Sequence, residues 1–402
     1  RQGCCMAPVL FNLYASLVVE RWTARIAKLG GVGVYLRYKH DGKLFRRYTK
    51  NAKEAWLTEC QFADDAALLA TTREGAERAM EEYLRVAEDF GLSVSIPKTK
   101  LMVTGRQVTE ADRAPLHVNN TVIESVTEFP YLGSLVASSG RVDTEVEKRI
   151  AQASRAFGAL RKPVFSDSTL YVATKRKVYQ ACVLSILLYG SECWTPLQRQ
   201  LKNLDSFHHR CIQTILGITN SQQWEEHITA LETRQRWGDL ETITDKVCKR
   251  RLEWLGHLAR MPNHRIPRMA LFGWLPQPRP KGGPRRRWRD TIRGDLKRLD
   301  IREDRWYREA CASRSGWKAL YNKAVSEECL QQQRESQPSN QVQCEQCHRQ
   351  FRREGDLKRH KCISERQKPI DQQRGATQCP VCKRWFRSQG GKAVHRCRPK
   401  SQ

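Results

Sequence analysis

The sequence lacks any apolar run long enough to cross a membrane, and its first residues do not predict a signal peptide. Within its 402 residues, no stretch approaches the roughly 18 uncharged apolar residues that a spanning helix needs. The most apolar segment, Ala181 to Gly190, is far shorter and predicts part of a buried helix. Residue 1 is Arg rather than Met and lies inside a sequence motif, so we expect the natural N-terminus to lie further upstream.

Regular cysteine spacing is also lacking over most of the chain. Of the 15 cysteines, six fall after residue 340 and nine are scattered singly or as one adjacent pair. An odd number of irregularly spaced cysteines argues against a disulfide framework and for reduced thiols in the cytosol or nucleus. The scattered residues are Cys4, Cys5, Cys60, Cys182, Cys193, Cys211, Cys248, Cys311 and Cys329.

Acidic residues are scarce relative to basic ones. The chain has 43 Asp and Glu against 71 Lys and Arg, a formal net charge of +28. This surplus favours nucleic acid as a partner, with an anionic membrane or a generically basic protein as the alternative. Apolar residues make up 40% of the chain, which is enough to build a core and excludes a wholly disordered protein.

Helical and strand-like patterns alternate over the first 140 residues. Apolar side chains from Leu10 to Trp22 recur at helical spacing. Residues 34–38 and 44–48 predict two strands joined by a turn at Asp41-Gly42, and residues 56–70 predict a second hairpin.

A helix is predicted next, with a capping box at Thr71 and Glu74 and an end at Gly91. Short strands are predicted after it, and this order favours an α+β sheet with helices on one face. The predicted strands cover residues 92–96, 101–104 and 121–126.

From Asp143 onward the pattern is helical. Two segments rich in proline or in polar residues, 276–284 and 331–343, predict linkers. A basic helix to Leu299 follows the first linker. The other predicted helices cover residues 143–162, 169–189, 201–216 and 237–258.

Two identical patterns of cysteine and histidine lie in the tail. Each reads Cys-x2-Cys-x12-His-x-Cys, and three thiolates with one imidazole suit tetrahedral Zn²⁺. From residue 331 the tail holds 17 Lys and Arg against 6 Asp and Glu. This surplus favours contact with nucleic acid, through residues such as Lys358 and Arg359 on the first unit, and the alternative is a purely structural or protein-docking finger. The predicted ligands are Cys344, Cys347, His360 and Cys362, and then Cys379, Cys382, His395 and Cys397.

Each unit resembles the classical zinc finger built on two Cys and two His. It departs from that family in having Cys as the last ligand and one residue, where the family has three to five, before it. The second unit also has Lys392 at an apolar helix position, and Gly390-Gly391 weakens the helix. We nevertheless predict two zinc sites, because such a module is too small to fold without metal.

The sequence Phe62-Ala63-Asp64-Asp65 stands between two apolar strand-like runs. Adjacent carboxylates at a tight turn can both approach a divalent cation, whereas in mid-strand they would point to opposite faces. Alone, such a pair is more often a solvated turn.

Its context resembles the reverse transcriptases of non-LTR retrotransposons. The segments Arg1-Gln2-Gly3, Asp64-Asp65, Pro97-Lys98 and Tyr131-Leu132-Gly133 occur in the order of that family's motifs B, C, D and E. The likeness covers residues 1 to about 140 and continues, more loosely, through a thumb-like helical region to about residue 260. It implies an RNA-directed DNA polymerase that uses Mg²⁺ or Mn²⁺.

The resemblance implies a role for each matching residue. Gln2 and Gly3 would line the template and incoming nucleotide, and Asp64, with Asp65 beside it, would bind metal. Lys98 would be a general acid toward pyrophosphate, although a solvated turn lysine explains it equally well. Tyr131, Leu132 and Gly133 would form the primer-grip hairpin, with simple core packing slightly favoured for Tyr131.

Two departures from that family stand out. Gly3-Cys4-Cys5-Met6-Ala7-Pro8 replaces its usual Gly-Cys-Pro-Leu-Ser-Pro. The family's third catalytic carboxylate, in motif A, would precede Arg1 together with the fingers. A two-metal site without that carboxylate should lose most of its activity, so we expect this chain alone to be at best a very poor polymerase.

Basic residues recur through the middle of the chain. The predicted thumb-like helices would face a duplex with Arg155, Arg161, Lys162, Lys175, Arg176 and Lys177. Tryptophans interleaved with arginines, such as Trp254, Trp274, Trp288 and Trp306, are expected mainly in the core. His208-His209 with Cys211 is expected to be packed rather than metal-binding. A further basic tract holds Lys281, Arg285, Arg286, Arg287 and Arg289. We expect it to contact phosphates or to serve as a nuclear-localisation signal, and a solvated loop is the less favoured alternative.

The predicted fold class is α+β: a partial right-hand polymerase palm with a mixed or antiparallel sheet, an all-α region, and two small ββα-like zinc fingers. The predicted divisions are 1–140 for the palm, 141–275 for the thumb-like helices, 276–330 for the basic connector, 331–343 for a linker, and 344–362 and 379–397 for the fingers.

The leading interpretation is a fragment of a non-LTR retrotransposon reverse transcriptase that binds an RNA template and a DNA target or primer, in nuclear and cytoplasmic ribonucleoprotein. The alternative is a non-catalytic nucleic-acid-binding zinc-finger protein derived from such an element. A zinc-finger transcription regulator is weaker, because two fingers read at most about six base pairs at roughly 3 bp each.

Overall fold

Short antiparallel strands and two long helices make up the first 140 residues, and helices make up most of the chain from Asp143 to Ser336. The computed structural model describes residues 4–30, 32–44, 50–105, 108–119, 121–226, 228–274, 287–336, 342–345, 350–351, 357–358, 377–378 and 385–386. The chain divides into two units, Arg1–Cys329 and Leu330–Gln402, which are described separately.

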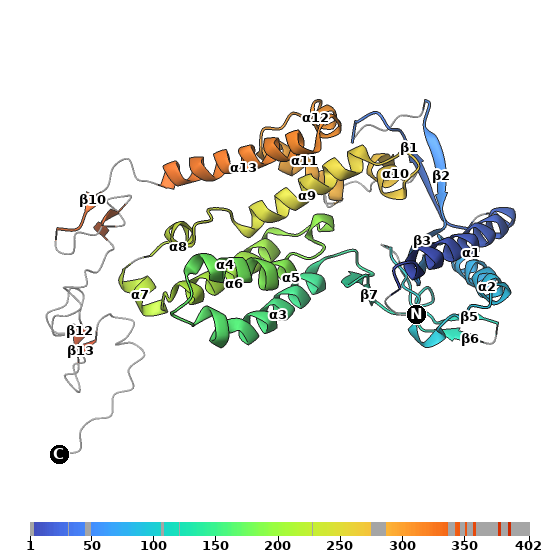
Figure 1. The fold of residues 1–402 in the computed structure, drawn as a ribbon, viewed down its shortest axis with the longest axis horizontal. Helices are drawn as coiled ribbons and strands as arrows, with labels where there is room; N and C mark the ends of the chain where they lie inside the picture. The colour runs from blue at the N-terminus through green and yellow to red at the C-terminus, as the bar shows by residue number, and fades with distance from the viewer. Residues whose placement is uncertain are drawn as a thin grey trace, which may run out of the picture. The chain divides into compact units, whose positions relative to one another are not determined.

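Helix α1 (Ala7–Leu29) packs against α2 (Arg73–Asp89), and the two helices lie side by side in Figure 1. Trp22 is fully buried between them and donates its indole N–H to the carbonyl oxygen of Ala79 at 3.1 Å. The helix predicted over Leu10 to Trp22 is present, but its apolar stripe is buried only from Val18 onward. Leu10 and Leu13 are exposed.

Helix α2 begins one residue later than the sequence predicts. Thr72, not Thr71, is the N-cap, and its hydroxyl accepts the amide N–H of Gly75 at 3.1 Å. The predicted end is confirmed: Gly91 has a φ of 66°, and the amide of Leu92 bonds back to the carbonyl of Ala87 at 2.8 Å. This left-handed glycine closes the last turn of the helix.

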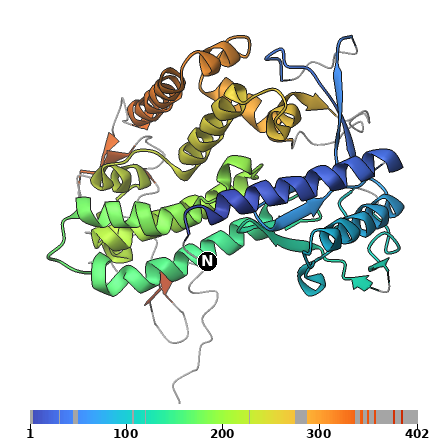
Figure 2. The same ribbon diagram turned by 45° about the vertical axis from the view of Figure 1, so that its right-hand side comes forward.

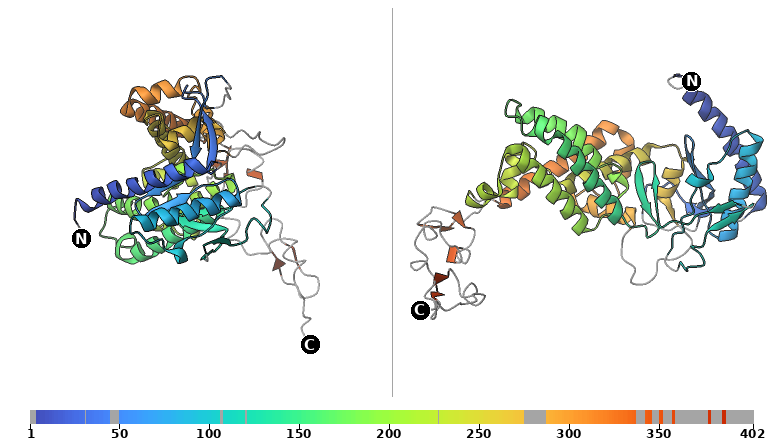
Figure 3. Two further views of the ribbon diagram at one scale, coloured as in Figure 1. Left: turned by 90° about the vertical axis from the view of Figure 1, so that its right-hand side faces the viewer. Right: turned by 90° about the horizontal axis from the view of Figure 1, so that it is seen from below.

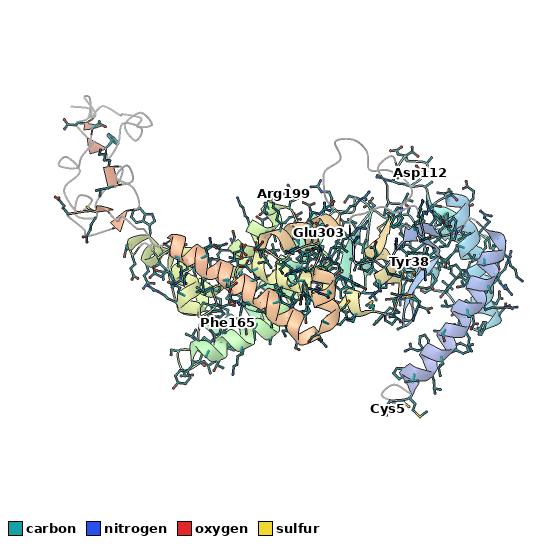
Figure 4. All side chains as sticks on the ribbon, turned by 90° about the horizontal axis from the view of Figure 1, so that it is seen from above. Cys5, Tyr38, Asp112, Phe165, Arg199 and Glu303 are labelled. Atoms are coloured by element: carbon teal, nitrogen blue, oxygen red, sulfur yellow. The ribbon has the colours of Figure 1, made fainter. Side chains whose placement is uncertain are left out.

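A three-stranded sheet joins distant parts of the first unit. Strand β1 (Val34–Tyr38) lies between β2 (Lys53–Leu57) and β9 (Gly273–Trp274), and Tyr38, labelled in Figure 4, pairs with Lys53 on one side and Gly273 on the other. The predicted pairing of β1 with residues 44–48 is wrong, because β2 occupies that edge. Leu44 is instead buried among the C-terminal helices, and residues 45–49 lie outside the described part.

Three separate two-stranded hairpins complete the strands of this segment. The expected larger sheet is not formed among the described residues. Residues 92–95 are not strand, Pro97 lies in a short 3₁₀ helix, η1 (Ile96–Lys98), and Leu101 makes one bridge to Ser125. The hairpins pair β3 (Glu59–Phe62) with β4 (Asp65–Leu68), β5 (Leu116–Val118) with β6 (Thr121–Ile123), and β7 (Glu128–Tyr131) with β8 (Ser134–Ala137).

The helical region begins with α3, which packs against α6 (Figures 1 and 2). The predicted helix over 237–258 is divided in the structure, because Gly238 has a φ of 75° and Thr242 caps a new helix. The elements are α3 (Asp143–Leu160), η2 (Arg161–Phe165), α4 (Val172–Tyr179), η3 (Gln180–Leu184), α5 (Ser185–Leu187), η4 (Ser191–Cys193), α6 (Gln198–Leu216), α7 (Asn220–Glu225), α8 (Ala230–Trp237) and α9 (Ile243–Arg260).

Further helices pack around the second half of α9, as Figure 3 shows for α9 in yellow and α11 to α13 in orange. They are α10 (Ile266–Phe272), α11 (Trp288–Arg298), α12 (Trp306–Ala312) and α13 (Arg314–Ser336). Helix α13 runs to Ser336, so the predicted linker over 331–343 does not begin at residue 331.

Two apolar cores hold the helices together. The first contains Phe165, Tyr179 and Trp237, and the second contains Trp306 and Trp317. The expectation for the tryptophans interleaved with arginines is confirmed for Trp306, which is fully buried, while Trp254 and Trp288 are partly buried against the second core. Among the described residues, no helix is both long and apolar enough to cross a membrane.

The described part of the tail contains two very short hairpins. Strand β10 (Val342–Gln343) pairs with β11 (Gln350–Phe351), and β12 (Thr377–Gln378) pairs with β13 (Trp385–Phe386). In each, the chain between the strands carries a predicted cysteine pair. The hairpins therefore occupy the same position in both sequence repeats.

Candidate functional site

The β3–β4 hairpin carries the adjacent aspartates. Phe62 pairs with Asp65, which leaves Ala63 and Asp64 as a two-residue turn. Ala63 has a φ of 52°, the left-handed conformation that such a tight turn requires. A hairpin is therefore present within the expected residues 56–70, but its turn lies one residue earlier than predicted: Asp64 is in the turn, whereas Asp65, expected beside it at the tip, is the first residue of β4.

Both carboxylates are exposed at the end of this hairpin. Within the described part of the chain, no side chain or backbone amide donates a hydrogen bond to either carboxylate, and none forms an ion pair with it. Their oxygens are therefore accessible to a hard divalent cation, which prefers carboxylate ligands. A Mg²⁺ ion held here would neutralise the charge that develops during phosphoryl transfer.

Tyr131 brings the third hairpin of the first unit next to the aspartate hairpin. Its hydroxyl donates to the carbonyl oxygen of Cys60 in β3 at 3.5 Å. Burial raises the pKa of Tyr131, and the acidic side chains of Cys60, Asp65 and Glu59 raise it further. The structure thus places the predicted motif C and motif E hairpins side by side.

The turn of the β7–β8 hairpin consists of Leu132 and Gly133, both with positive φ (47° and 81°). Glycine adopts this conformation readily, whereas it is strained for leucine. Leu132 is 39% exposed, so its side chain is available at the end of the hairpin.

Three residues that the sequence analysis did not single out hold this turn. Arg149 Nη2 donates to the carbonyl oxygen of Gly133 at 2.6 Å, and Tyr189 Oη donates to the carbonyl oxygen of Leu132 at 2.8 Å. Glu145 Oε2 accepts the amide N–H of Leu135 at 2.7 Å. In the sequence, the i,i+4 spacing of Glu145 and Arg149 at the edge of an apolar helical stripe could have indicated that these two residues form an ion pair.

Lys98 lies in η1 and is exposed. In the described part of the chain, no hydrogen bond or ion pair joins it to Asp64 or Asp65. Its role as a general acid stays a prediction. Gln2 and Gly3, the predicted motif B residues, lie outside the described residues.

The arginine-rich tract is described from residue 287 onward. Arg287 is exposed at the start of α11, whereas Arg289 Nη1 donates to the carbonyl oxygen of Leu44 at 2.9 Å. Arg289 therefore connects α11 to the segment that follows β1, and its contact with nucleic acid stays a prediction. Lys281, Arg285 and Arg286 lie outside the described residues.

The helical region exposes part of its predicted basic surface. Arg155, Arg161 and Lys177 are exposed, as expected. Lys175 is buried, and Arg176 donates to the carbonyl oxygen of Trp237 at 2.8 Å, so these two residues contribute to the fold instead.

His208 is packed in the interior of the helical region, as expected. It is buried, and its Nδ1 lies 2.8 Å from the hydroxyl of Tyr179. Burial lowers the pKa of His208 to about 3 and raises the pKa of the neighbouring Cys211 to about 12. Both side chains are therefore uncharged at neutral pH.

Of the predicted zinc ligands the structure describes Cys344, which is buried next to β10. No group of three His, Cys, Asp or Glu side chains suited to a metal occurs among the described residues. Lys358 is described and exposed. The remaining predicted residues lie outside the described part of the chain: Cys347, Arg359, His360, Cys362, Cys379, Cys382, His395 and Cys397.

Comparison with known proteins finds similarity over the segment that contains these hairpins. Residues 1–136 match the family described as Reverse transcriptase (RNA-dependent DNA polymerase). An uncharacterized transposon-derived protein of Caenorhabditis elegans is 26% identical over 250 residues, which cover 61% of this chain and 87% of that protein. No solved structure matches the chain. The chain therefore carries a reverse transcriptase domain in residues 1–136 and is distantly related to a transposon-derived protein.

Proposed function

We propose that this chain is part of the RNA-directed DNA polymerase of a non-LTR retrotransposon, and that residues 4–137 contact the growing DNA end. One observation carries the proposal: Tyr131 of the β7–β8 hairpin contacts the strand that leads to Asp64 and Asp65. A reverse transcriptase needs a metal-binding carboxylate and a surface for the primer close together. In this proposal the two hairpins provide both, and they lie in the segment that matches the family.

In this proposal Asp64 is a metal ligand and Asp65 supports it. Their exposed oxygens, without described protein partners, fit a Mg²⁺ or Mn²⁺ ion. Leu132 and Gly133 contact the primer strand, and Lys98 acts near the pyrophosphate. Gln2 and Gly3 line the template and the incoming nucleotide.

The tail contributes binding in this proposal. Three cysteines and one histidine in each repeat bind Zn²⁺, supported by hairpins at equivalent positions, β10–β11 and β12–β13. Lys358, Arg359 and the tract from Lys281 to Arg289 contact phosphates of RNA or DNA, which agrees with the basic surplus of the tail. The assembly works as a ribonucleoprotein in the nucleus and cytoplasm.

Photo-crosslinking from the primer end tests the polymerase assignment. The probe is a DNA primer annealed to an RNA template, with a photoreactive thiothymidine as the recessed 3′-terminal base. After irradiation with the full chain and Mg²⁺, mass spectrometry identifies the crosslinked peptides. We expect crosslinks within residues 59–68 and 128–137.

Two controls sharpen this experiment. Asp64→Asn should lower the Mg²⁺-dependent crosslinks, whereas Asp112→Asn, at another exposed carboxylate of the same segment, should not. A primer with the thiothymidine in its middle should crosslink elsewhere. Crosslinks confined to residues 275–402 would overturn the polymerase assignment and favour a non-catalytic zinc-finger protein.

A further inference from the structure

A buried ion pair in α3 is directed at the turn of the β7–β8 hairpin. Arg149 Nε and Glu145 Oε1 lie 2.7 Å apart, and both residues are more than nine-tenths buried. A buried pair adds little net stability unless its remaining donors and acceptors are satisfied. Here Arg149 Nη2 and Glu145 Oε2 bond to the backbone of the hairpin, at Gly133 and Leu135, and Arg149 Nη1 bonds to Gln152 Oε1.

Tyr189 completes this arrangement from the turn after α5. The guanidinium carbon of Arg149 lies 4.5 Å from the centre of the Tyr189 ring, and the Tyr189 hydroxyl bonds to the carbonyl of Leu132. The next residue, Gly190, approaches the hairpin closely, because a Cβ there would lie 2.9 Å from Ser134 Oγ. The contact therefore needs both the side chain of Tyr189 and a glycine after it.

These bonds determine where the turn's amide groups point. In a trans peptide the C=O and the following N–H point in opposite directions. Since Tyr189 holds the carbonyl of Leu132, the N–H of Gly133 points away from Tyr189. Among the described residues, no acceptor bonds to the N–H of Leu132 or Gly133.

We propose that Tyr189 and Arg149, with Glu145, are positioning residues that hold the Leu132–Gly133 turn in the orientation that receives the primer strand. This inference rests on the proposed polymerase function. The left-handed conformation of Leu132 is unfavourable alone, so the turn needs outside contacts to keep one geometry. The three residues supply those contacts from the thumb-like helices.

Tyr189→Phe is the sharpest test, because it removes one hydrogen bond and keeps the ring beside Arg149. Tyr171→Phe, at an 84% exposed tyrosine of the same helical region, is the matched control. The readout is the yield of crosslinks from the primer's 3′-terminal thiothymidine to residues 128–137. We expect it to fall at least about threefold in Tyr189→Phe, as loss of one hydrogen bond implies, and to stay unchanged in Tyr171→Phe.

Other readouts separate positioning from general damage. The thermal unfolding midpoint and the crosslinks from the mid-primer base should not change in Tyr189→Phe. Equal end-crosslink yields in wild type and Tyr189→Phe would overturn the positioning role while leaving the polymerase assignment in place. Wild-type end crosslinks to residues 59–68 but not to this hairpin would also overturn the positioning role alone. Wild-type end crosslinks confined to residues 275–402 would overturn both.

A second variant pair addresses Arg149. Arg149→Ala would leave Glu145 buried without a partner and could unfold the chain. Arg149→Met combined with Glu145→Gln removes both charges and keeps the volume. We expect this double variant to fold and to lose end crosslinks at least as much as Tyr189→Phe, and a folded double variant with wild-type yield would also overturn the proposal.

Discussion

Tyr131 donates its hydroxyl to the carbonyl oxygen of Cys60, three residues before the turn that carries Ala63 and Asp64. This contact links two hairpins separated by about 70 residues of sequence, including all of α2. A carboxylate pair alone is weak evidence for a polymerase, whereas the pair beside a second rigid turn defines a surface that could hold a DNA end. Substitutions at this surface and in the fold that supports it have distinct expected outcomes.

Asp64 should be dispensable for folding. Its carboxylate is exposed and makes no hydrogen bond with the described residues, so Asp64→Asn should change the free energy of unfolding by no more than about 0.5 kcal/mol. Urea titration followed by circular dichroism measures this change. A clearly larger loss would mean that the carboxylate serves the fold, and the crosslinking defect of the variant could not then be assigned to metal binding.

The ion pair between Arg251 and Asp295 should be essential for stability. Arg251 Nε and Nη2 lie 2.7 and 2.9 Å from the two carboxylate oxygens, and both side chains are buried. Arg251→Met should cost about 3–5 kcal/mol, because it leaves a buried carboxylate unpaired. Chemical denaturation tests this value.

A double variant and a surface pair control that experiment. Arg251→Met with Asp295→Leu should recover most of the lost stability, because no charge remains buried. Arg236→Met, in a pair with Glu232 that is more than 40% exposed, should cost less than about 1 kcal/mol. A similar loss of unfolding free energy in Arg236→Met and Arg251→Met would contradict the claim that the buried pair matters more than the exposed pair.

Acid should destabilise the helical region through His208. Burial lowers the pKa of His208 to about 3 in the folded chain, below the ordinary value of 6.5 in the unfolded chain. The unfolded state therefore binds the proton first. This contribution to stability is complete above pH 6.5 and is lost as the pH falls toward 3, by up to about 1.4 kcal/mol per pH unit.

His208→Gln isolates this contribution. Thermal unfolding of wild type and variant at a series of pH values should show a shallower loss of stability in the variant between neutral pH and pH 4. The carboxylates common to both proteins cancel in the difference. Parallel curves would show that the pKa of His208 is the same in the folded and unfolded states, which would contradict the prediction.

The tail should bind two zinc ions independently of the larger unit. The two repeats each supply three cysteines and one histidine, and residues 330–402 form a unit of their own. Cys347→Ser and Cys382→Ser should each remove one zinc per chain, measured by mass spectrometry of the metal, because a lost thiolate leaves three ligands. Cys182→Ser, at an exposed cysteine of the helical region, should remove none. Full zinc content in Cys347→Ser would refute the first site.

Local patterns in the sequence were sufficient for much of the fold. The 3.6-residue period predicted α3 and α6, and the two apolar runs around Asp64 predicted its hairpin. Gly91 predicted the end of α2. These features depend on neighbours a few residues apart, so the sequence alone determines them. The spacing of the tail's cysteines and the surplus of basic residues can likewise be read from the sequence alone.

Pairings between distant segments were decided only by the tertiary structure. Strand β1 could pair with any suitable edge, and it pairs with Lys53–Leu57 and with Gly273–Trp274 because Leu44 and the C-terminal helices form one core beside it. The same holds for Glu145, Arg149 and Tyr189, which converge on one turn from separate elements. Their charges and hydroxyl look ordinary in the sequence, since only packing of the helices brings them within hydrogen-bond distance of Leu132 and Gly133.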